Sequence, residues 1–237
     1  MHELVKLSKR LKTVATFVSK GAYLADIGSD HGYLPCYICQ HDDDAKAIAS
    51  EVREGPFLRT KETVEHYQLS ERIDVRLGDG LSVLTEQDPI TDIVIAGMGG
   101  SLITQILTDG KSLLRYVNKI IVQPNNNAQR IRKFFIDNQL TLTSETILEE
   151  NNQIYEILVA ETKKLQSPYD DTISLEKQLF FGPFLMSEKS AVFKKKWQFE
   201  KEKITKILIQ LRSNEAQNVD KIKLFQNQLH WIEEALK

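Results

Sequence analysis

Short apolar segments alternate with amphipathic ones along residues 20–162, and this alternation limits the fold more than any other feature of the sequence. Strands are expected at 22–27, 46–50, 73–77, 91–96, 118–123, 140–148 and 153–161. Helices are expected at 4–19, 33–40, 55–68, 101–108 and 127–138. Strands that alternate with helices usually pair in parallel, and the last two strands are expected as an antiparallel pair. The pattern therefore predicts an α/β fold with a doubly wound seven-stranded sheet.

The chain follows a different pattern after residue 172. Apolar residues recur at steps of three and four in two stretches, 189–212 (Phe193, Trp197, Ile204, Ile207, Leu211) and 222–236 (Ile222, Phe225, Leu229, Ile232, Leu236). With the polar turn 213–215 between them, they predict an antiparallel helical hairpin with coiled-coil packing. Residues 163–172 are expected as a linker between domains 1–162 and 173–237. The hairpin either stabilises the chain or holds a macromolecular substrate, and the pattern leaves both open.

Composition and charge exclude some classes of protein. The sequence has no run of about 18 apolar residues, the length that crosses a bilayer, and no apolar secretory block near residue 1. We therefore expect a cytoplasmic protein without a membrane partner. The net charge is −2, which gives no general bias toward nucleic acid. The basic run Lys194–Lys196 is either a solvated helix face or a surface that contacts phosphates.

The two cysteines, Cys36 and Cys39, are separated by two residues. A metal site of cysteines would need a second pair, and His41 is too close in sequence to complete a tetrahedral site comfortably. We therefore expect both side chains to be buried as small apolar groups, and no metal is expected.

A loop rich in glycine and acidic residues follows the first expected strand: Asp26-Ile27-Gly28-Ser29-Asp30-His31-Gly32-Tyr33-Leu34-Pro35. In doubly wound folds the ligand lies beyond the carboxyl ends of the strands, at the turn into the first helix. Gly28 permits a tight turn, and Gly32 permits close approach of a ligand or of the next helix. Asp30 stands where a dinucleotide-binding loop carries a glycine, and its carboxylate would repel a pyrophosphate. The loop therefore favours the sulfonium cofactor S-adenosylmethionine over NAD.

Acidic residues also end the next two expected strands. Glu51 closes the second strand, where an acid can accept hydrogen bonds from both ribose hydroxyls. Asp79, which lies between Gly78 and Gly80, follows the third strand, where a carboxylate can accept from an adenine amino group. Each acid alone is more often a solvated strand end, but three acids at successive strand ends indicate a nucleoside-binding edge.

Two further motifs end the fourth and fifth expected strands. The fourth ends in Ala96-Gly97-Met98-Gly99-Gly100, where methyltransferases of exocyclic amines usually carry an Asn/Asp-Pro-Pro-aromatic tetrad. Its glycines leave room for a flat base. The fifth ends in Gln123-Pro124-Asn125-Asn126-Asn127, in which Asn126 or Asn127 is expected to cap the next helix. Gln123 and Asn125 either cap or contact a base edge.

Four segments together resemble the bacterial tRNA (adenine-22-N1)-methyltransferase family, in which 22 is a tRNA position. They are Leu7-Ser8-Lys9-Arg10-Leu11, the loop 26–35, the segment 96–100 and Gln123-Pro124-Asn125. The resemblance covers essentially the whole chain, and the combination of motifs carries it. It implies a Rossmann-like class I methyltransferase domain with a carboxyl-terminal coiled-coil arm. It also implies methylation of N1 of an adenine in the D-arm region of tRNA, with S-adenosylmethionine as cofactor.

The resemblance also assigns residues to the site. Those expected to bind the cofactor are Asp26, Gly28, Ser29, Asp30, Gly32, Glu51, Asp79, Gly80, Ala96, Gly97, Met98 and Gly99. Those expected at the target base, as the catalytic group, are Arg10, Asp30, His31 and Asn125. Asp30 and the carbonyls of Ala96 and Gly97 would stabilise the positive charge that develops on the methylated ring. His31 either relays a proton or only hydrogen-bonds within its loop.

Transfer RNA is the expected partner, and a second subunit is not expected to be required. Three alternatives remain. The enzyme could methylate another ring nitrogen or a small molecule, although the helical arm argues against a small substrate. The chain could instead be a non-catalytic RNA-binding protein with a vestigial cofactor pocket, against which Asp26, Glu51 and Asp79 argue. A nicotinamide dehydrogenase is disfavoured by the sequence of the loop after the first strand.

Overall fold

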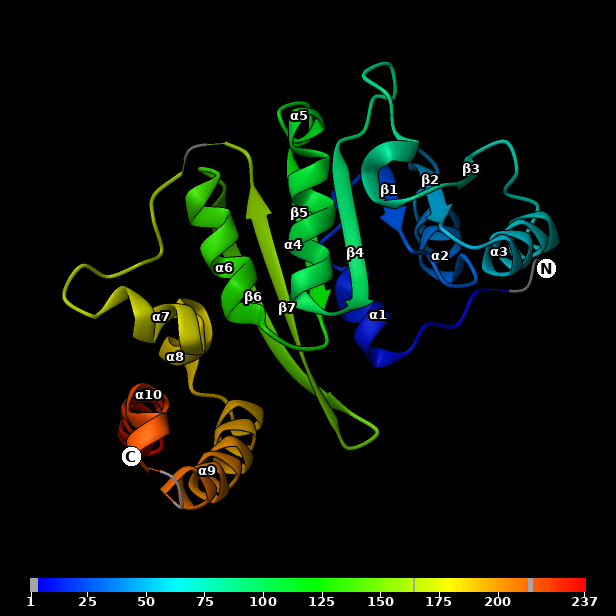
Figure 1. The fold of residues 1–237 in the computed structure, drawn as a ribbon. Coiled ribbons are helices and arrows are strands. Elements are labelled where there is room, and N and C mark those ends of the chain that lie inside the picture. Colours follow the sequence, from blue (N-terminus) through cyan, green and yellow to red (C-terminus); the bar gives the residue numbers. More distant parts are fainter. Residues whose placement is uncertain (1–3, 164, 213–214) are drawn as a thin grey trace. The chain divides into compact units, whose positions relative to one another are not determined.

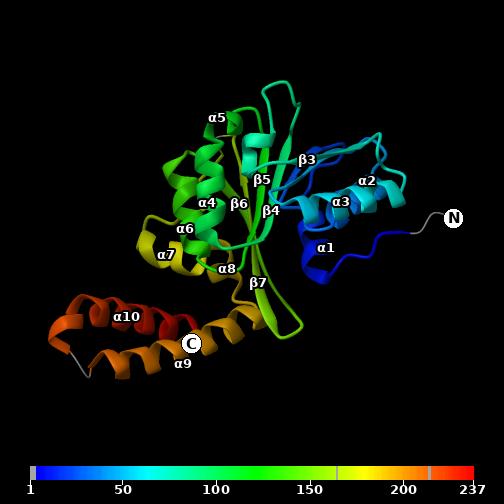
Figure 2. The same cartoon turned by 45° about the vertical axis from the view of Figure 1, so that its right-hand side comes forward.

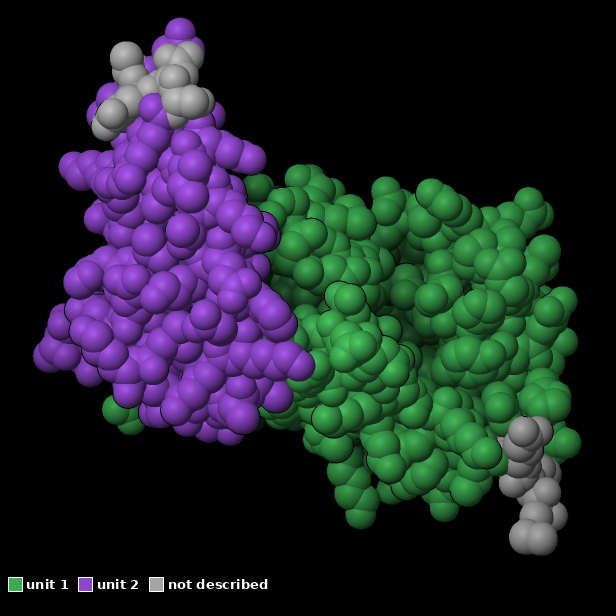
Figure 3. All heavy atoms as spheres, turned by 90° about the horizontal axis from the view of Figure 1, so that it is seen from below, with its two compact units in different colours: residues 1–168 green, residues 169–237 purple. Residues whose placement is uncertain are grey.

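The computed structural model describes residues 4–163, 165–212 and 215–237. The chain divides into two compact units, Met1–Pro168 and Tyr169–Lys237, which are coloured separately in Figure 3. The division after Pro168 falls within residues 163–172, the segment expected as a linker. The two units are described in turn.

The first unit is built on a seven-stranded sheet with the strand order β3-β2-β1-β4-β5-β7-β6 (Figure 1). The strands are β1 Tyr23–Ile27, β2 Lys46–Glu51, β3 Ile73–Leu77, β4 Asp92–Met98, β5 Lys119–Pro124, β6 Thr141–Glu150 and β7 Gln153–Glu161. Strands β1 to β5 pair in parallel, and β7 pairs antiparallel with both β5 and β6. The seven strands and the closing antiparallel pair confirm the sequence prediction.

Helices cover both faces of this sheet, as Figures 1 and 2 show. On one face lie α1 Lys9–Ala15, α2 Tyr33–His41 and α3 Glu54–His66. On the other lie α4 Gly100–Asp109 and α6 Ala128–Asp137, with the short α5 Lys111–Leu114 and the 3-10 helix η1 Gly80–Val83 near α4. The strand order reverses between β1 and β4, which is where ligands bind in doubly wound sheets.

The central strands are apolar on both faces because helices bury both. Leu24 of β1, Ile93 and Ile95 of β4, and Ile120 and Ile121 of β5 are fully buried. Near-continuous apolar runs of this kind are typical of parallel strands covered on both sides. The core therefore fixes the strands rigidly, and their polar carboxyl ends emerge together at one edge of the sheet.

The first helix is shorter than the sequence predicts. It begins after Ser8, whose Oγ accepts a hydrogen bond from the Leu11 N–H (3.2 Å), and it ends at Ala15. Before it, Val5 is buried and donates its N–H to Oε1 of Gln40 on α2 (2.8 Å). The prediction of a helix over 4–19 is therefore wrong in its extent, because the helix begins only after the Ser8 cap and Leu4 before it is exposed.

A buried ion cluster holds α6 on the last two strands. Arg132 of α6 is fully buried, and its Nε donates to Oε1 of Glu145 on β6 (2.6 Å). Its Nη2 donates to Oε2 of Glu156 on β7 (3.2 Å). A buried arginine without such partners would cost several kcal/mol. The cluster therefore fixes the register of α6 against β6 and β7, and nothing in the apolar periodicity indicated it.

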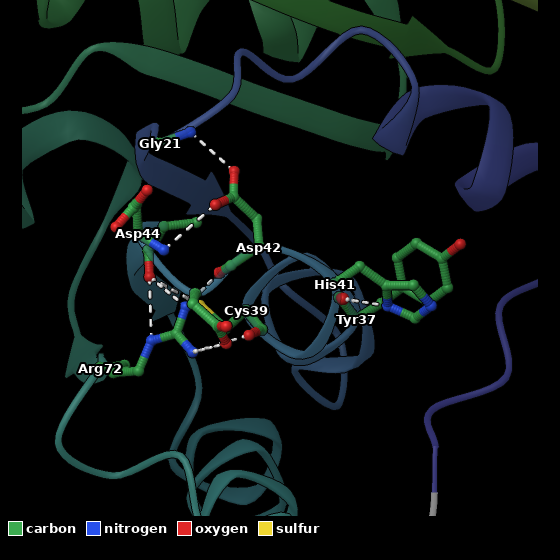
Figure 4. Close-up of polar contacts among 9 residues, drawn as sticks. Gly21, Tyr37, Cys39, His41, Asp42, Asp44 and Arg72 are labelled. Carbon is green, nitrogen blue, oxygen red and sulfur yellow. Dashed lines mark hydrogen bonds and ion pairs between the residues drawn. The ribbon is translucent and has the colours of Figure 1, made fainter.

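The edge of the sheet at which the parallel strands begin is fastened by Arg72, as Figure 4 shows. Its guanidinium donates to the carbonyls of Cys39 (2.8 Å), Asp42 and Ala45 (2.7 Å). Asp42 in turn accepts the N–H of Gly21 through its carboxylate (2.7 Å). These contacts join the end of α2 to the starts of β1, β2 and β3, at the opposite edge from the polar strand ends.

Cys36 and Cys39 are buried on α2 and are not joined to each other, which confirms the prediction that they pack as small apolar groups. Burial raises the pKa of Cys36 to about 12 and that of Cys39 to about 11. In the part of the chain that the structure describes, no His, Cys, Asp and Glu side chains group as metal ligands. No described helix has the length and apolar character needed to span a membrane.

The second unit consists of four helices: α7 Leu175–Phe181, α8 Pro183–Glu188, α9 Ala191–Arg212 and α10 Glu215–Ala235. The last two lie side by side (Figures 1 and 2), and Lys201 Nζ in the middle of α9 pairs with Glu233 Oε1 near the end of α10 (3.0 Å). This antiparallel pairing confirms the hairpin. The helix expected over 222–236 begins earlier, at Glu215, with a break at Asn218. Ser213 and Asn214 of the expected turn lie outside the described residues.

The packing of the hairpin departs from a strict heptad. Phe193, Trp197 and Ile204 are buried as predicted, but Leu208 is buried and Ile207 only half-buried. After Ile204 the seam therefore steps by four residues where the predicted heptad steps by three. The helices α7 and α8 were not predicted, and they supply Phe181, whose ring centroid lies 4.6 Å from that of Trp197. The unit thus has an aromatic core of its own.

Candidate functional site

The residues singled out by sequence gather at the carboxyl edge of the sheet, where β1, β2, β4 and β5 end. The loop after β1 is tied to β2, because the N–H groups of Gly28 (2.9 Å) and Ser29 (3.1 Å) both donate to the Ser50 carbonyl. The end of β2 is tied to β3, because the Gly78 N–H donates to the Glu51 carbonyl (2.8 Å). The ends of β1, β2 and β3 therefore form a hydrogen-bonded rim at this edge.

The loop after β1 needs several left-handed residues in a short span. Gly28 has φ +70°, and Asp30, His31 and Gly32 follow with φ values of +43°, +76° and +70°. A Cβ at Gly32 would lie 3.0 Å from Thr60 Cγ2 of α3, so the second glycine also permits close packing. Non-glycine residues adopt such angles at a cost of about 1–3 kcal/mol each, a strain that concentrates at functional sites. The surrounding rim holds the loop in this conformation.

Asp26 ends β1 as a buried carboxylate. It is 3% exposed, and Ser29 Oγ donates to its Oδ2 (2.5 Å). Burial raises its pKa to about 7, the Ser29 hydrogen bond lowers it, and the nearby charge of Glu51 raises it further. A carboxyl group with such a pKa is poised to lose its proton when a cationic ligand arrives.

Glu51 ends β2 and supports the loop after β1. Its Oε1 accepts the N–H of Asp30 (2.5 Å). Burial is the largest cause of its raised pKa. The apolar side chains of Val52 and Leu77, which lie beside the ends of β2 and β3, are exposed to solvent. The Glu51 carboxylate therefore has two exposed apolar neighbours, Val52 next in the chain and Leu77 opposite it in the β2–β3 pairing.

Asp79 and Gly80 lie one strand further along. Asp79 is exposed, and its carbonyl accepts from Ser82 Oγ (2.5 Å). Gly80 has φ +53°, and a Cβ there would meet Ile106 of α4 at 3.2 Å. Both residues border a cavity of about 400 Å³ between η1 and the end of α4. The residues that line this hollow include none of the loop 26–35, Glu51 or the segment 96–100, so the hollow extends away from the rim toward the end of α4.

Asp30 and His31 face solvent more than the sequence suggested. The Asp30 side chain is 85% exposed, and His31 Nε2 lies 3.7 Å from its Oδ1. The His31 ring stacks on the Tyr33 ring with centroids 5.6 Å apart and planes 15° apart. Asp30 therefore makes its rim contact through its backbone N–H, and its carboxylate is directed outward.

The end of β4 contains a β-bulge at Gly97. The register between β4 and β5 shifts between Ala96 and Met98, and Gly97 has φ +76°. A Cβ at Gly28 would lie 2.3 Å from Met98 Cε, so the methionine side chain lies directly over the first loop glycine. A Cβ at Gly100 would meet the Asn127 carbonyl oxygen at 2.6 Å. The glycines thus serve a bulge and the close approach of the β5–α6 loop.

A second cluster joins α1, β4 and β5. Arg10 Nη1 (2.5 Å) and the Gly97 N–H (3.1 Å) both donate to Oε1 of Gln123, which is fully buried. Gln123 Nε2 donates to Asn125 Oδ1 (3.3 Å), and Asn125 Nδ2 donates to the Gly97 carbonyl (2.7 Å). Arg10 and Asn125, which sequence assigned to one place, are therefore brought together through Gln123.

Two residues of this cluster were not predicted. The Arg10 guanidinium carbon lies 5.4 Å from the centroid of the Tyr155 ring on β7, a cation–π contact. The carboxylate of Glu150, at the end of β6, accepts the N–H groups of Lys9 (2.6 Å) and Arg10 (3.1 Å). Both come from the closing antiparallel pair, more than 130 residues after Arg10, and apolar alternation gave no sign of them.

The expected cap of α6 is wrong. Asn127 occupies the N-cap position with φ +54°, and its side chain accepts no hydrogen bond from the helix. The side chain of Asn126 instead accepts the N–H of Gly100 at the start of α4 (3.3 Å). A side-chain cap usually comes from a residue with extended backbone, whereas Asn127 is left-handed. Asn126 therefore contacts the start of α4 and does not cap α6.

This topology, with acids ending β1 and β2 and a glycine bulge ending β4, defines a Rossmann-like class I methyltransferase. Residues 24–234 match the family TrmK, tRNA (adenine(22)-N(1))-methyltransferase. The chain belongs to this family. It is 45% identical to the tRNA (adenine(22)-N(1))-methyltransferase of Bacillus subtilis, over 100% of this chain and 99% of that protein.

Solved structures agree with this assignment. The crystal structure of the B. subtilis M1A22 tRNA methyltransferase TrmK superposes with a TM-score of 0.90 and 42% identity, covering 98% of this chain and 100% of that one. A Streptococcus pneumoniae protein in complex with S-adenosyl-L-methionine gives a TM-score of 0.86 and 39% identity, covering 98% and 100%. The likeness therefore spans both units of the chain.

Proposed function

We propose that this protein methylates N1 of adenine 22 in tRNA, with S-adenosylmethionine as methyl donor. The full-length match to the B. subtilis enzyme carries the proposal. The site adds chemical support, because acidic rim groups lie at one edge of the sheet together with the Arg10–Gln123–Asn125 cluster. The acids Asp26, Glu51 and Asp79 at the strand ends argue against a vestigial pocket without catalysis.

The rim residues fit the proposed cofactor. Asp26 and Glu51 suit a ligand with a positive charge and ribose hydroxyls, since both have raised pKa values that a cation would lower. Glu51 uses Oε1 for Asp30, and we assign its Oε2 to the ribose. Val52 and Leu77 would flank the adenine ring, with Asp79 and Gly80 at its edge. Gly28, Ser29 and Gly32 would shape the loop around the amino-acid tail.

The bulge after β4 would bound the methyl-transfer face of the site. Ala96, Gly97, Met98 and Gly99 would face the cofactor, with Met98 over Gly28. S-adenosylmethionine supplies a methyl group carried on a positively charged sulfur. Adenine N1 has an in-plane lone pair and is unprotonated at neutral pH, so no base is needed before attack. The protein's task is to align N1, the methyl carbon and the sulfur.

The target adenine must leave its stack before N1 is accessible. We assign Asn125 to the edge of the extruded base and His31, stacked on Tyr33, to its surroundings. Methylation leaves a positive charge on the ring, which Asp30 would stabilise from the outer side. The Arg10 cation would oppose that charge at close range. Its guanidinium is held by Gln123 and Tyr155, and we therefore assign it to a phosphate or ribose of the target nucleotide.

We assign the first unit, residues 1–162 in the sequence division, to the cofactor and the second, residues 173–237, to tRNA. The second unit has an aromatic core of its own, in agreement with such a division. We expect that an oligomer is not required. The enzyme would act in the cytoplasm, where tRNA is available.

One assay tests the activity. The full-length protein is incubated with unmodified tRNA and S-adenosylmethionine labelled in the methyl group, and the modified nucleosides are identified. We expect 1-methyladenosine at position 22 and no label in a transcript with guanine at that position. Label in another nucleoside would support a different ring nitrogen. Cofactor binding by calorimetry without any methylation would support a non-catalytic RNA-binding protein.

A truncated chain tests the assignment of the arm. A protein ending at Pro168 should bind S-adenosylmethionine, because the rim is contained in the first unit. It should not methylate tRNA at a measurable rate if the second unit provides the tRNA contacts. Full turnover by the truncated protein would show that the arm has only a structural role.

A further inference from the structure

Gln123 is the only residue that links the Arg10 side of the site to the Asn125 side in the hydrogen bonds of the described residues. Its side chain is fully buried at the end of β5. Oε1 lies between two donors, Arg10 Nη1 (2.5 Å) and the Gly97 N–H (3.1 Å). Nε2 lies 3.3 Å from Asn125 Oδ1. A buried amide with this many bonds is held in one orientation.

The polarity of this chain of contacts is fixed at both ends. A guanidinium and a backbone N–H can only donate, so the Gln123 atom between them must be its oxygen. Its nitrogen then faces Asn125, so the Asn125 atom there must be an acceptor. At the far end, the Gly97 carbonyl can only accept, and it receives Asn125 Nδ2 (2.7 Å). Exchange of the oxygen and nitrogen of either amide would lose hydrogen bonds. The network therefore fixes which amide atom is oxygen and which is nitrogen.

Asn125 is exposed at the strand end, with its carbonyl oxygen oriented by Gln123. An amide oxygen has two lone pairs, and Gln123 uses one. The second lone pair is suited to accept from an exocyclic amino group. Adenine carries such a group beside N1, whereas guanine carries a carbonyl oxygen there and a proton on N1. A carbonyl of fixed orientation therefore distinguishes the two purines.

We propose that Gln123 is a positioning residue that fixes the Asn125 amide so that its oxygen reads the exocyclic amino group of the target adenine. This inference rests on the proposed function and adds the residue that sets base selection. Gln123 touches no substrate itself. It acts through Asn125 on one side, and the same oxygen keeps the Arg10 cation beside Tyr155 on the other.

Two substitutions of Gln123 distinguish its contacts with Arg10 and Gly97 from its contact with Asn125. Gln123→Glu keeps acceptors for Arg10 and the Gly97 N–H but removes the donor toward Asn125. Gln123→Met removes both halves at similar length. Asn125→Ala removes the reading group itself from an exposed position, where core packing is little affected. Gln139→Glu adds the same charge at an exposed residue after α6, and it serves as the matched control.

The substrates are two tRNA transcripts, with adenine or with unsubstituted purine at position 22. Purine lacks the amino group but keeps N1. Loss of the amino group also changes the nucleophilicity of N1, but equally for every variant, so the comparison between variants isolates the contact. The measurement is kcat and KM for each transcript, with thermal unfolding and S-adenosylmethionine affinity for each protein.

For the wild type and Gln139→Glu we expect the purine transcript to lower kcat by at least about tenfold, the scale of a lost contact to a fixed polar group. In Gln123→Glu, Gln123→Met and Asn125→Ala the purine penalty, the ratio of kcat for the adenine transcript to kcat for the purine transcript, should be about tenfold smaller. A tenfold factor corresponds to ~1.4 kcal/mol. KM should change little, since phosphate contacts supply most tRNA affinity. Cofactor affinity should be unchanged.

An unchanged purine penalty in the Gln123 variants would overturn the proposal, and an unchanged penalty in Asn125→Ala would do so even if the Gln123 variants failed to fold. Failure of the proposed function would look different, because the wild type itself would then methylate neither transcript at position 22.

Discussion

At the scale of single residues, the environment of Asp26 has a consequence for pH. Its pKa in the native protein is about 7, because burial opposes the charged form, against an ordinary value of 3.8. Between these two values the native state binds a proton that the unfolded chain has released. The free energy of unfolding therefore falls as pH rises from about 4 to 7, by up to ~1.4 kcal/mol per pH unit.

We expect the wild type to be less stable at pH 8 than at pH 5, and Asp26→Asn to lose most of this difference. Urea unfolding of both proteins at the two pH values checks it. Asp88, whose pKa Arg76 lowers to about 2, acts only below pH 4 and does not interfere. An equal pH dependence in both proteins would mean that Asp26 is ionised throughout this range.

Glu51 should be required for cofactor affinity. Glu51→Ala removes a charged acceptor for the ribose and also the acceptor for the Asp30 N–H. A hydrogen bond to a charged group contributes roughly 1.5–3 kcal/mol, so S-adenosylmethionine affinity should fall by about tenfold or more. Titration calorimetry measures this, with the exposed Glu54→Ala as control. Equal affinities for wild type and Glu51→Ala would place the ribose elsewhere.

The sequence was sufficient for residues whose place follows from strand ends. Asp26 and Glu51 lie in the last two residues of β1 and β2, and Asp79 lies two residues after β3, so correct strand limits locate them at the rim. Gln123 was seen at the end of β5, but its orientation depends on Arg10, 113 residues away. Such pairings depend on packing between distant segments, and periodicity within one segment does not contain them.

At the scale of elements, the short α1 depends on a carboxylate from another part of the fold. Glu150 accepts the first N–H groups of the helix, from Lys9 and Arg10, and these bonds lower its pKa. A negative group at a helix amino terminus is favourable because it pairs with unsatisfied N–H groups. The position of Arg10 therefore depends on the turn between β6 and β7.

We expect Glu150→Ala to loosen α1 and to lower kcat for tRNA severalfold, without an effect on cofactor affinity. Hydrogen exchange of residues 4–15 should become faster. Because the pKa of Glu150 is lowered, its contribution is lost only in acid, and the effect of the exchange should be constant between pH 6 and 8. Glu62→Ala on the exposed face of α3 is the control. Unchanged exchange in residues 4–15 would contradict the anchoring role.

The limits of the elements show which local signals decide them. The strands were located because their apolar runs are dictated by burial on both faces. The helix expected over 4–19 was too long, because the Ser8 cap competes with an apolar periodicity that continues through it. The helices α7 and α8 were missed because Gly182 and Pro183 interrupt them after a single short stretch each.

At the scale of the whole molecule, charge is divided unevenly between the parts. The net charge of the chain is −2, but α9 carries a basic surface. Lys194 and Lys195 are exposed there, and Lys196 Nζ lies 4.7 Å from the centroid of the Trp197 ring. Lysines that neutralise phosphates strengthen binding of all tRNAs alike, without reading bases. We therefore propose that the exposed pair contacts tRNA phosphates, whereas base selection belongs to Asn125.

We expect Lys194→Ala with Lys195→Ala to weaken tRNA binding and to flatten its log–log salt dependence by roughly 0.7–0.9 per lost phosphate contact. Binding of S-adenosylmethionine should be unaffected. The control is Lys20→Ala with Lys46→Ala, an equal change of charge on exposed residues at the starting edge of the sheet. If the log–log salt dependence of tRNA affinity were equal for the two double variants, the α9 lysines would only solvate the helix.

The buried thiols of α2 have a practical consequence for measuring tRNA binding. Only the thiolate reacts readily with maleimides or haloacetamides, and pKa values of about 12 and 11 leave Cys36 and Cys39 protonated and shielded at neutral pH. A single cysteine introduced at an exposed site, such as Lys206→Cys on α9, would therefore take a fluorophore or spin label selectively. The proposed contact between tRNA and the arm can therefore be followed by spectroscopy in real time without first removing a native cysteine.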